Sequence, residues 1–176
     1  MVTISLLLAA VLQTNATPKP GELGAFYFDA LNQSQVWVNL SPESVEPGPN
    51  PVLLNVTVSF PGRRLEGAPK AAEIRTTAIS TAFPLRIRQP ILRFETGDGR
   101  QYDLTAPGRV WQFVANCEAC PLDTLTTRLA FDELSEIARS SEVTLNALGF
   151  ALRLTPSEVS ALQTLIDAVT DGVTIK

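Results

Sequence analysis

Apolar and polar residues alternate most regularly along residues 52–60. Every second position is apolar: Val52, Leu54, Val56, Val58 and Phe60. The positions between them are mostly polar, so an extended chain here has one apolar and one largely polar face. This period of two predicts a half-buried strand of an antiparallel sheet that ends at the turn Pro61-Gly62.

Two further pairs of alternating segments predict hairpins. Residues 25–30 and 35–40 flank one short connection, and residues 91–96 and 100–105 flank Gly97-Asp98-Gly99. Asp-Gly between alternating apolar residues is a strong hairpin signal. Four side chains are expected on the inner face of the second hairpin: Leu92, Phe94, Tyr102 and Leu104.

Prolines interrupt the chain between these segments. Residues 41–51 contain four prolines and a glycine, so they are expected to form a connecting loop. Residues 73–83 are expected to form a strand, after which Pro84 and Pro90 enclose a short apolar and basic segment. Because proline lacks the amide hydrogen that a sheet ladder needs, these prolines favour edge positions.

The pattern changes towards the C-terminus. Strands are predicted at 110–115 and 126–131, and a short helix after them is expected to open at Asp132, whose carboxylate can accept free amide hydrogens. Alternation returns over residues 143–154 and slips in phase at Leu148-Gly149, which indicates a bulge or a tight turn.

The last helix has the clearest start signal. Thr155-Pro156-Ser157-Glu158 forms a capping box with proline at the first helical position, and Gly172 can end the helix with a positive φ. Five residues are expected on its core face: Val159, Leu162, Leu165, Ile166 and Val169.

These patterns predict an α+β fold, mainly antiparallel β. We expect a sandwich-like sheet of about eight or nine strands, with two short helices near the C-terminus. A chain of 176 residues is typical of one domain. The expected domain covers residues 25–176, with strands and hairpins in 25–115 and a strand-helix-strand-helix run in 121–176. A flexible segment, 17–24, is expected to precede it.

The first residues predict export. An apolar run, 4–12, is followed by small uncharged residues, which fits a signal peptide over residues 1–16 with cleavage after Ala16. The start, Met1-Val2-Thr3, has no Lys or Arg, so an N-terminal strand or a start inside a longer leader stays an alternative. The expected location is periplasmic or extracellular. No segment approaches the roughly 20 apolar residues of a membrane span, so the mature chain is expected to lack one.

Cys117 and Cys120 are the only cysteines of the chain. In an oxidising compartment they can form a disulfide that holds the loop after a strand, which is the favoured interpretation. Free thiols, a redox pair and half of a zinc site stay alternatives. Zinc would need further ligands, and the chain has no His. No metal and no cofactor are therefore expected.

The absence of histidine also narrows the catalytic chemistry. It excludes Ser-His-Asp and Cys-His catalysis, and the sequence contains neither a Ser-x-x-Lys motif nor a glycine-rich phosphate loop. A pair of carboxylates stays open, because two acids can meet in space from any sequence spacing.

Charge is divided along the chain. Residues 63–109 hold nine basic and five acidic residues, a net +4, which leaves −8 for the remainder. The arginines alternate with apolar residues, which favours a solvated strand face and no nucleic-acid partner. Six residues are candidates for a binding surface, although the aromatic ones also fit core packing: Trp37, Tyr102, Trp111, Arg86, Arg88 and Arg93.

The favoured hypothesis is an exported non-enzymatic binding or structural module. It would contact a protein or another envelope component through exposed strand edges or a loop-rich end. The alternatives are a small secreted enzyme, either a carboxylate-based hydrolase or a thiol oxidoreductase using Cys117 and Cys120, and a carbohydrate-binding module. A ligand-sized cleft lined by Trp37 or Trp111 would favour sugar binding.

Overall fold

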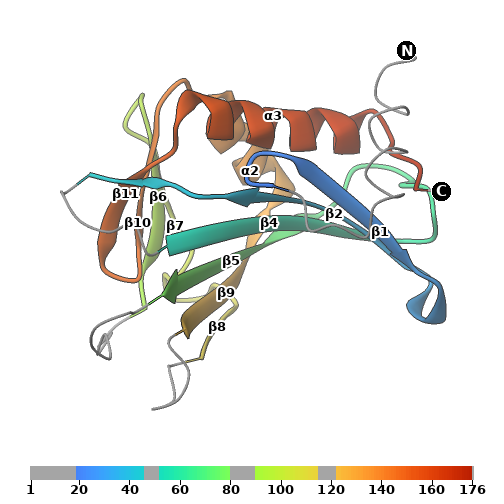
Figure 1. Cartoon of the computed structure of the whole chain (residues 1–176), viewed down its shortest axis with the longest axis horizontal. Coiled ribbons are helices and arrows are strands. Elements are labelled where there is room, and N and C mark those ends of the chain that lie inside the picture. Colours follow the sequence, from blue (N-terminus) through green and yellow to red (C-terminus); the bar gives the residue numbers. More distant parts are fainter. Residues whose placement is uncertain (1–18, 46–51, 80–89, 115–121, 176) are drawn as a thin grey trace.

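The computed structural model describes residues 19–45, 52–79, 90–114 and 122–175. They form two antiparallel sheets and two α-helices (Figure 1). This confirms the predicted fold class, with eleven strands in the described residues in place of about eight or nine.

The larger sheet has six strands. Their spatial order is β1 (Leu23–Phe28), β2 (Gln33–Leu40), β4 (Val52–Pro61), β5 (Ala71–Ile79), β9 (Leu122–Ala130) and β8 (Trp111–Val114). The smaller sheet has the order β3 (Glu43–Ser44), β11 (Phe150–Arg153), β10 (Val143–Ala147), β6 (Leu92–Thr96) and β7 (Gln101–Asp103). A 3-10 turn, η1 (Asp29–Leu31), follows β1, and the helices are α2 (Phe131–Arg139) and α3 (Pro156–Thr170).

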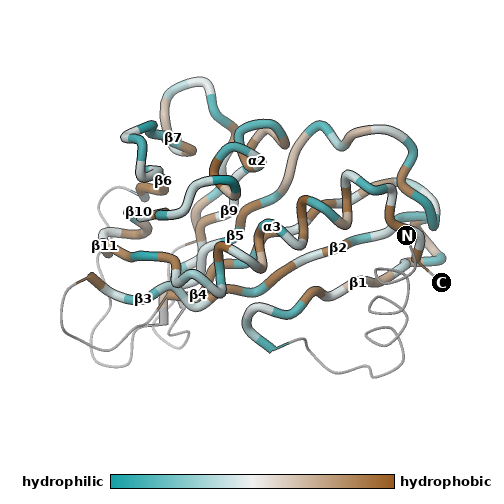
Figure 2. Tube along the Cα trace, turned by 90° about the horizontal axis from the view of Figure 1, so that it is seen from above, coloured by the Kyte–Doolittle hydropathy of each residue, from teal (hydrophilic) through white to brown (hydrophobic). Residues whose placement is uncertain are grey.

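One face of the six-stranded sheet is buried, and we call it the inner face. The five apolar side chains predicted to share a face of β4 all lie in the core, each at most 3% exposed. In the register of the sheet, Val56 lies between Val38 of β2 and Ile74 of β5, both fully buried. Figures 1 and 2 both place α3 along β2, and α2 packs against α3, β5 and β9. The period of two therefore sets which side of the sheet faces the helices.

Most local predictions are confirmed. The first predicted hairpin forms from β1 and β2, and the four residues expected on the inner face of the β6–β7 hairpin are all buried. Leu148 and Gly149 both have positive φ, 54° and 88°, and join β10 to β11 as a two-residue turn. The phase slip in the sequence thus marks a hairpin turn and not a bulge.

The N-terminus of α3 is capped as predicted, and it also anchors a distant loop. The Glu158 carboxylate accepts hydrogen bonds from the backbone amide of Thr155 at 2.8 Å and from that of Ser41, just after β2, at 2.6 Å. Glu158 is 7% exposed, so one buried side chain joins the helix start to the six-stranded sheet. Gly172 follows the helix with φ 77°, also as predicted.

Three predictions are corrected. Residues 41–51 were expected to form a loop, but residues 43–44 form a short strand, β3, which pairs with β11 and has too few residues to show alternation. The strands on either side of Pro84 and Pro90 were predicted at edges, yet β5 lies between β4 and β9, and β6 lies between β10 and β7. Tertiary pairing therefore decides their positions; Pro84 itself lies outside the described residues.

No helix in the described residues is long and apolar enough to cross a membrane.

The third correction concerns the start of α2. The helix begins at Phe131 after Ala130, and Glu133, not Asp132, bonds the backbone amide of Ala130. Glu133 also makes a two-point ion pair with Arg109, with distances of 2.8 and 2.5 Å. The hydrogen bonds from Arg109 lower the pKa of the Glu133 carboxyl. The pair joins the loop before β8 to α2.

This pKa shift predicts an acid-dependent loss of stability. Because the folded pKa is below the ordinary glutamate value of 4.5, the pair stabilises the fold fully above that pH and is lost as the pH falls through the lowered pKa. Glu133→Gln should lower the free energy of unfolding at pH 7 by about 1 kcal/mol, and by much less near about pH 3. Urea unfolding at both values measures this. Glu142→Gln, at an exposed acid with no ion pair to a described residue, is the control; a Glu133→Gln effect that does not change with pH would contradict the prediction.

Candidate functional site

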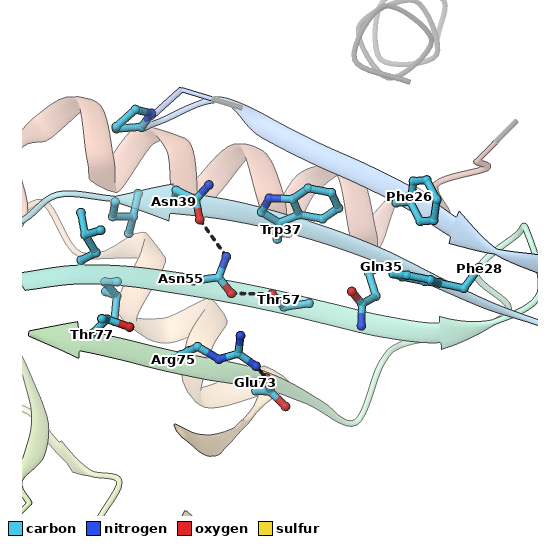
Figure 3. Close-up of a pocket in the computed structure, with 14 residues that line it drawn as sticks. Phe26, Phe28, Gln35, Trp37, Asn39, Asn55, Thr57, Glu73, Arg75 and Thr77 are labelled. Carbon is cyan, nitrogen blue, oxygen red and sulfur yellow. Dashed lines mark hydrogen bonds and ion pairs between the residues drawn. The ribbon is translucent and has the colours of Figure 1, made fainter. Parts of the chain in front are cut away.

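The outer face of the six-stranded sheet, opposite the helices, carries a groove of about 500 Å³ over β1, β2, β4 and β5 (Figure 3). Its floor is built from the side chains that alternate with the core residues, such as Trp37 on β2 and Asn55 on β4. This volume lies within the range of sites that hold small ligands, about 300–1,000 Å³. We therefore describe this outer groove as the candidate site.

Trp37 lies flat against the edge strand β1 because the residue beside it is glycine. Gly24 is the register partner of Trp37, and a Cβ atom on Gly24 would clash with ring atoms Cε2 and Cζ2. A glycine in a strand interior often marks such a close approach. The indole nitrogen of Trp37 donates no hydrogen bond to a described residue, so it can serve a ligand. The indole ring is thus held in one position, and its N–H group is available to donate a hydrogen bond to a ligand.

Two phenylalanines extend the aromatic surface along β1. Phe26 and Phe28 are 46% and 38% exposed, and their rings meet edge to face with centroids 4.6 Å apart. Both face the same side of the sheet as Trp37, since Phe26 pairs with Gln35 and Phe28 with Gln33. Large apolar side chains exposed together on one face are a common mark of a binding surface.

A row of polar side chains crosses the floor of the groove. The side-chain amide of Asn55 donates to Asn39 Oδ1 at 2.8 Å, and the Thr57 hydroxyl donates to Asn55 Oδ1 at 2.7 Å (Figure 3). This leaves the amide nitrogen of Asn39 and the whole side-chain amide of Gln35 without a bond to a described residue. An amide presents both donors and an acceptor, so the row can bond hydroxyl groups in either direction.

The charges of the groove balance each other. Arg75 Nη2 lies 3.2 Å from Glu73 Oε1, and these two residues are the charged members of the described lining. Their side chains are 55% and 39% exposed, so the pair lies at the solvent-facing side of the site. The groove as a whole is therefore neutral.

A second hollow, of about 450 Å³, lies between the β6–β7 hairpin and α2. Tyr102 Oη donates to Glu136 Oε2 at 2.6 Å, and Arg100 bridges Glu136 at 3.2 Å and Asp98 at 3.1 Å. The bond to Glu136 raises the pKa of Tyr102, and a hydrogen bond from Thr96 lowers that of Asp98. Because each acid here already has a cationic partner, we interpret this network as a tether between the hairpin and the helix.

The structure does not bring the predicted binding residues together. Trp37 lies in the outer groove, but Trp111 points to the opposite face, since its register partner on β9, Thr127, is buried on the inner side. Tyr102 is 8% exposed and belongs to the core, as the packing alternative had it. Arg93 is paired with Asp103 at 2.8 Å on the smaller sheet.

Four predicted residues cannot be placed: Arg86, Arg88, Cys117 and Cys120 lie outside the described residues. Within the described part of the chain, no three acidic, histidine or cysteine side chains gather to hold a metal ion.

The sequence did not indicate that the other residues of the groove belong to a binding surface. Phe26, Phe28, Asn39, Asn55 and Arg75 share a face because Asn39 pairs with Asn55 and Asn55 pairs with Arg75 in register. Alternation alone would have shown that each of these side chains lies on the face of its strand that is opposite the core. Only the pairing of the strands shows that these residues are neighbours.

Comparison of the chain with protein-family models, with curated proteins and with solved structures returns no match. The arrangement of the residues therefore provides the basis for a functional proposal.

The contact of Trp37 with Gly24 predicts a specific sensitivity. Gly24→Ala should push the indole off β1, shift its fluorescence emission to longer wavelength and destabilise the fold by about 1–3 kcal/mol. The change is measured in a Trp111→Phe background, so that Trp37 is the one emitting tryptophan.

Gly97→Ala is the matched control, since its added Cβ would meet its nearest neighbour, Glu142 Cβ, at 3.4 Å, an ordinary contact. An emission maximum that Gly24→Ala leaves unchanged would show that the indole does not lie on β1.

Proposed function

We propose that this protein is an exported, non-enzymatic binding module that holds a neutral oligosaccharide in the outer groove. The observation that supports this most is Trp37, an indole fixed against β1 beside a row of side-chain amides. Sugar chains of a cell envelope or an extracellular matrix are ligands that an exported module would meet.

The groove matches the chemistry of a sugar ring. One face of a pyranose ring is formed by C–H groups that pack on an aromatic surface, while its hydroxyls both donate and accept hydrogen bonds. Trp37 offers the aromatic surface, and Asn39 and Gln35 offer amide groups without partners in the described residues. An apolar peptide would leave these polar groups unpaired, which costs affinity.

The charge balance favours a neutral ligand. Glu73 and Arg75 bond each other, so an acidic or a basic ligand would have to separate an existing ion pair to gain a counter-ion. Glu73 is also the single carboxylate of the described lining, whereas glycoside hydrolysis uses two acids about 5–10 Å apart. The lining thus favours binding over cleavage.

The test is a titration of short neutral oligosaccharides, such as hexamers of β-1,4-glucose, β-1,3-glucose, mannose, xylose and N-acetylglucosamine. Isothermal calorimetry should detect at least one of them, and Trp37→Ala should weaken that binding at least about tenfold. Asn55→Ala should weaken it less, because Asn55 mainly orients Asn39.

Trp111→Ala is the control for the loss of a tryptophan, since Trp111 faces the other side of the sheet, and it should bind as the wild type does. If no hexamer binds, or if Trp111→Ala and Trp37→Ala weaken binding equally, the outer groove is not an oligosaccharide site.

A further inference from the structure

The outermost strand of the six-stranded sheet beyond β9 is β8, drawn at the lower border of the sheet in Figure 1. β8 pairs with β9 on one side, and no described residue pairs with its other side. Three apolar side chains along this segment are strongly exposed: Val110 at 73%, Val114 at 54% and Trp111 at 42%. An edge strand that pairs with no described residue on one side is a template for another strand.

The two edges of the smaller sheet carry protection that β8 lacks. Exposed edges are usually blunted by shortness or by charge. β3 has two residues, one of them Glu43, and β7 has three, with Asp103 in an ion pair with Arg93. The remaining edge, β1, has no charged residue in Leu23–Phe28; beside it, the Arg63 guanidinium lies 3.9 Å from the centroid of the Tyr27 ring and forms an ion pair with Asp29. Residues 110–114 contain no charge at all.

The sequence of this edge is a chemical palindrome. Val110-Trp111-Gln112-Phe113-Val114 reads valine, aromatic, glutamine, aromatic, valine in both directions. In an antiparallel pair, residues directly opposite each other point to the same face of the sheet. Consider a two-fold axis that is perpendicular to the sheet and passes between the two copies of Gln112. It would place valine opposite valine, aromatic residue opposite aromatic residue, and glutamine opposite glutamine.

We infer that β8 binds β8 of a second copy of this chain. Trp111 would meet Phe113 of the partner subunit on the inner side, and Val110 would meet Val114 of the partner subunit on the outer side. The register to β9 supports these faces, since Trp111 and Phe113 lie opposite Thr127 and Leu125, which are buried on the inner side. Such an interface is isologous, as expected of a two-fold dimer.

The choice of a second copy over an unrelated peptide depends on the palindrome. A foreign strand would need only apolar residues at alternate positions, and nothing would then require like residues at equal distances from Gln112. Self-pairing covers all three exposed apolar side chains at once, and it puts the polar Gln112 amides opposite each other, where each can donate and accept.

The dimer would join two six-stranded sheets into one continuous sheet. Because the axis is perpendicular to the sheet, the two outer grooves would open on the same side, where one long polymer could contact both. The contact itself is small, one short strand from each subunit, so a weak dimer with a Kd between about 1 µM and 1 mM is expected.

Charge at position 112 tests the inference directly. Gln112 is exposed, so Gln112→Lys and Gln112→Glu should both fold, and a charged residue protects a free edge. In the dimer, however, residue 112 meets its own copy about 5 Å away, where like charges repel. Sedimentation velocity over a concentration series should show the wild type forming dimers and each variant remaining monomeric.

An equimolar mixture of Gln112→Lys and Gln112→Glu should dimerise again, because opposite charges then meet on the axis. Gln101→Lys is the matched control, an exposed glutamine on the edge strand β7, and it should dimerise as the wild type does. A wild type that stays monomeric up to about 1 mM, or a dimer that the separate charge variants leave intact, would overturn the inference. So would a mixture that stays monomeric. None of these results depends on whether the outer groove binds sugar.

Discussion

The burial of one face of the six-stranded sheet is the constraint on which the rest of the structure depends. The inner side chains of β2, β4 and β5 form a continuous apolar surface that belongs to one core together with the buried side chains of the two helices and the smaller sheet. Because side chains alternate along a strand, fixing the inner set also fixes the outer set. A one-residue slip in the register would put the outer groove into the core and the core into water.

The properties of the outer groove follow from this sidedness. Its residues are free of the packing demands of the core, yet they are held in place by strands whose other face is buried. Trp37 is positioned by Gly24 across the β1–β2 ladder, and the Asn39–Asn55 bond runs across the β2–β4 ladder. A rigid sheet thus presents an aromatic ring and hydrogen-bonding groups at fixed spacing, which lowers the entropy that ligand binding has to overcome.

The sequence predicts the elements whose signals are local. Strand β4, the turns at Asp98 and Gly149, and the capping box of α3 each depend on neighbouring residues, and each is confirmed. Features that depend on distant pairing were missed. The strand β3 exists because β11 lies beside it, and Glu158 bonds Ser41 from the far end of the chain.

The candidate site shows the same division. Both tryptophans were candidates for one binding surface, but the strands that carry them place them on opposite faces of one sheet. The charged and amide residues of the groove become neighbours only through the register of β2, β4 and β5. A single sequence indicates which side chains of a strand share a face, but it does not indicate the order of the strands in the sheet.

Because the two tryptophans lie on opposite faces of the sheet, their NMR signals give the most direct measurement of the face on which a ligand binds. In the nitrogen-15 NMR spectrum of the chain, each indole N–H gives its own signal, assigned by Trp37→Phe and Trp111→Phe. On titration with a short neutral oligosaccharide that binds, the Trp37 signal and the side-chain amide signals of Asn39 and Gln35 should move while the Trp111 signal stays in place. Movement of the Trp111 signal with an unchanged Trp37 signal would place the ligand elsewhere and contradict binding on the outer face.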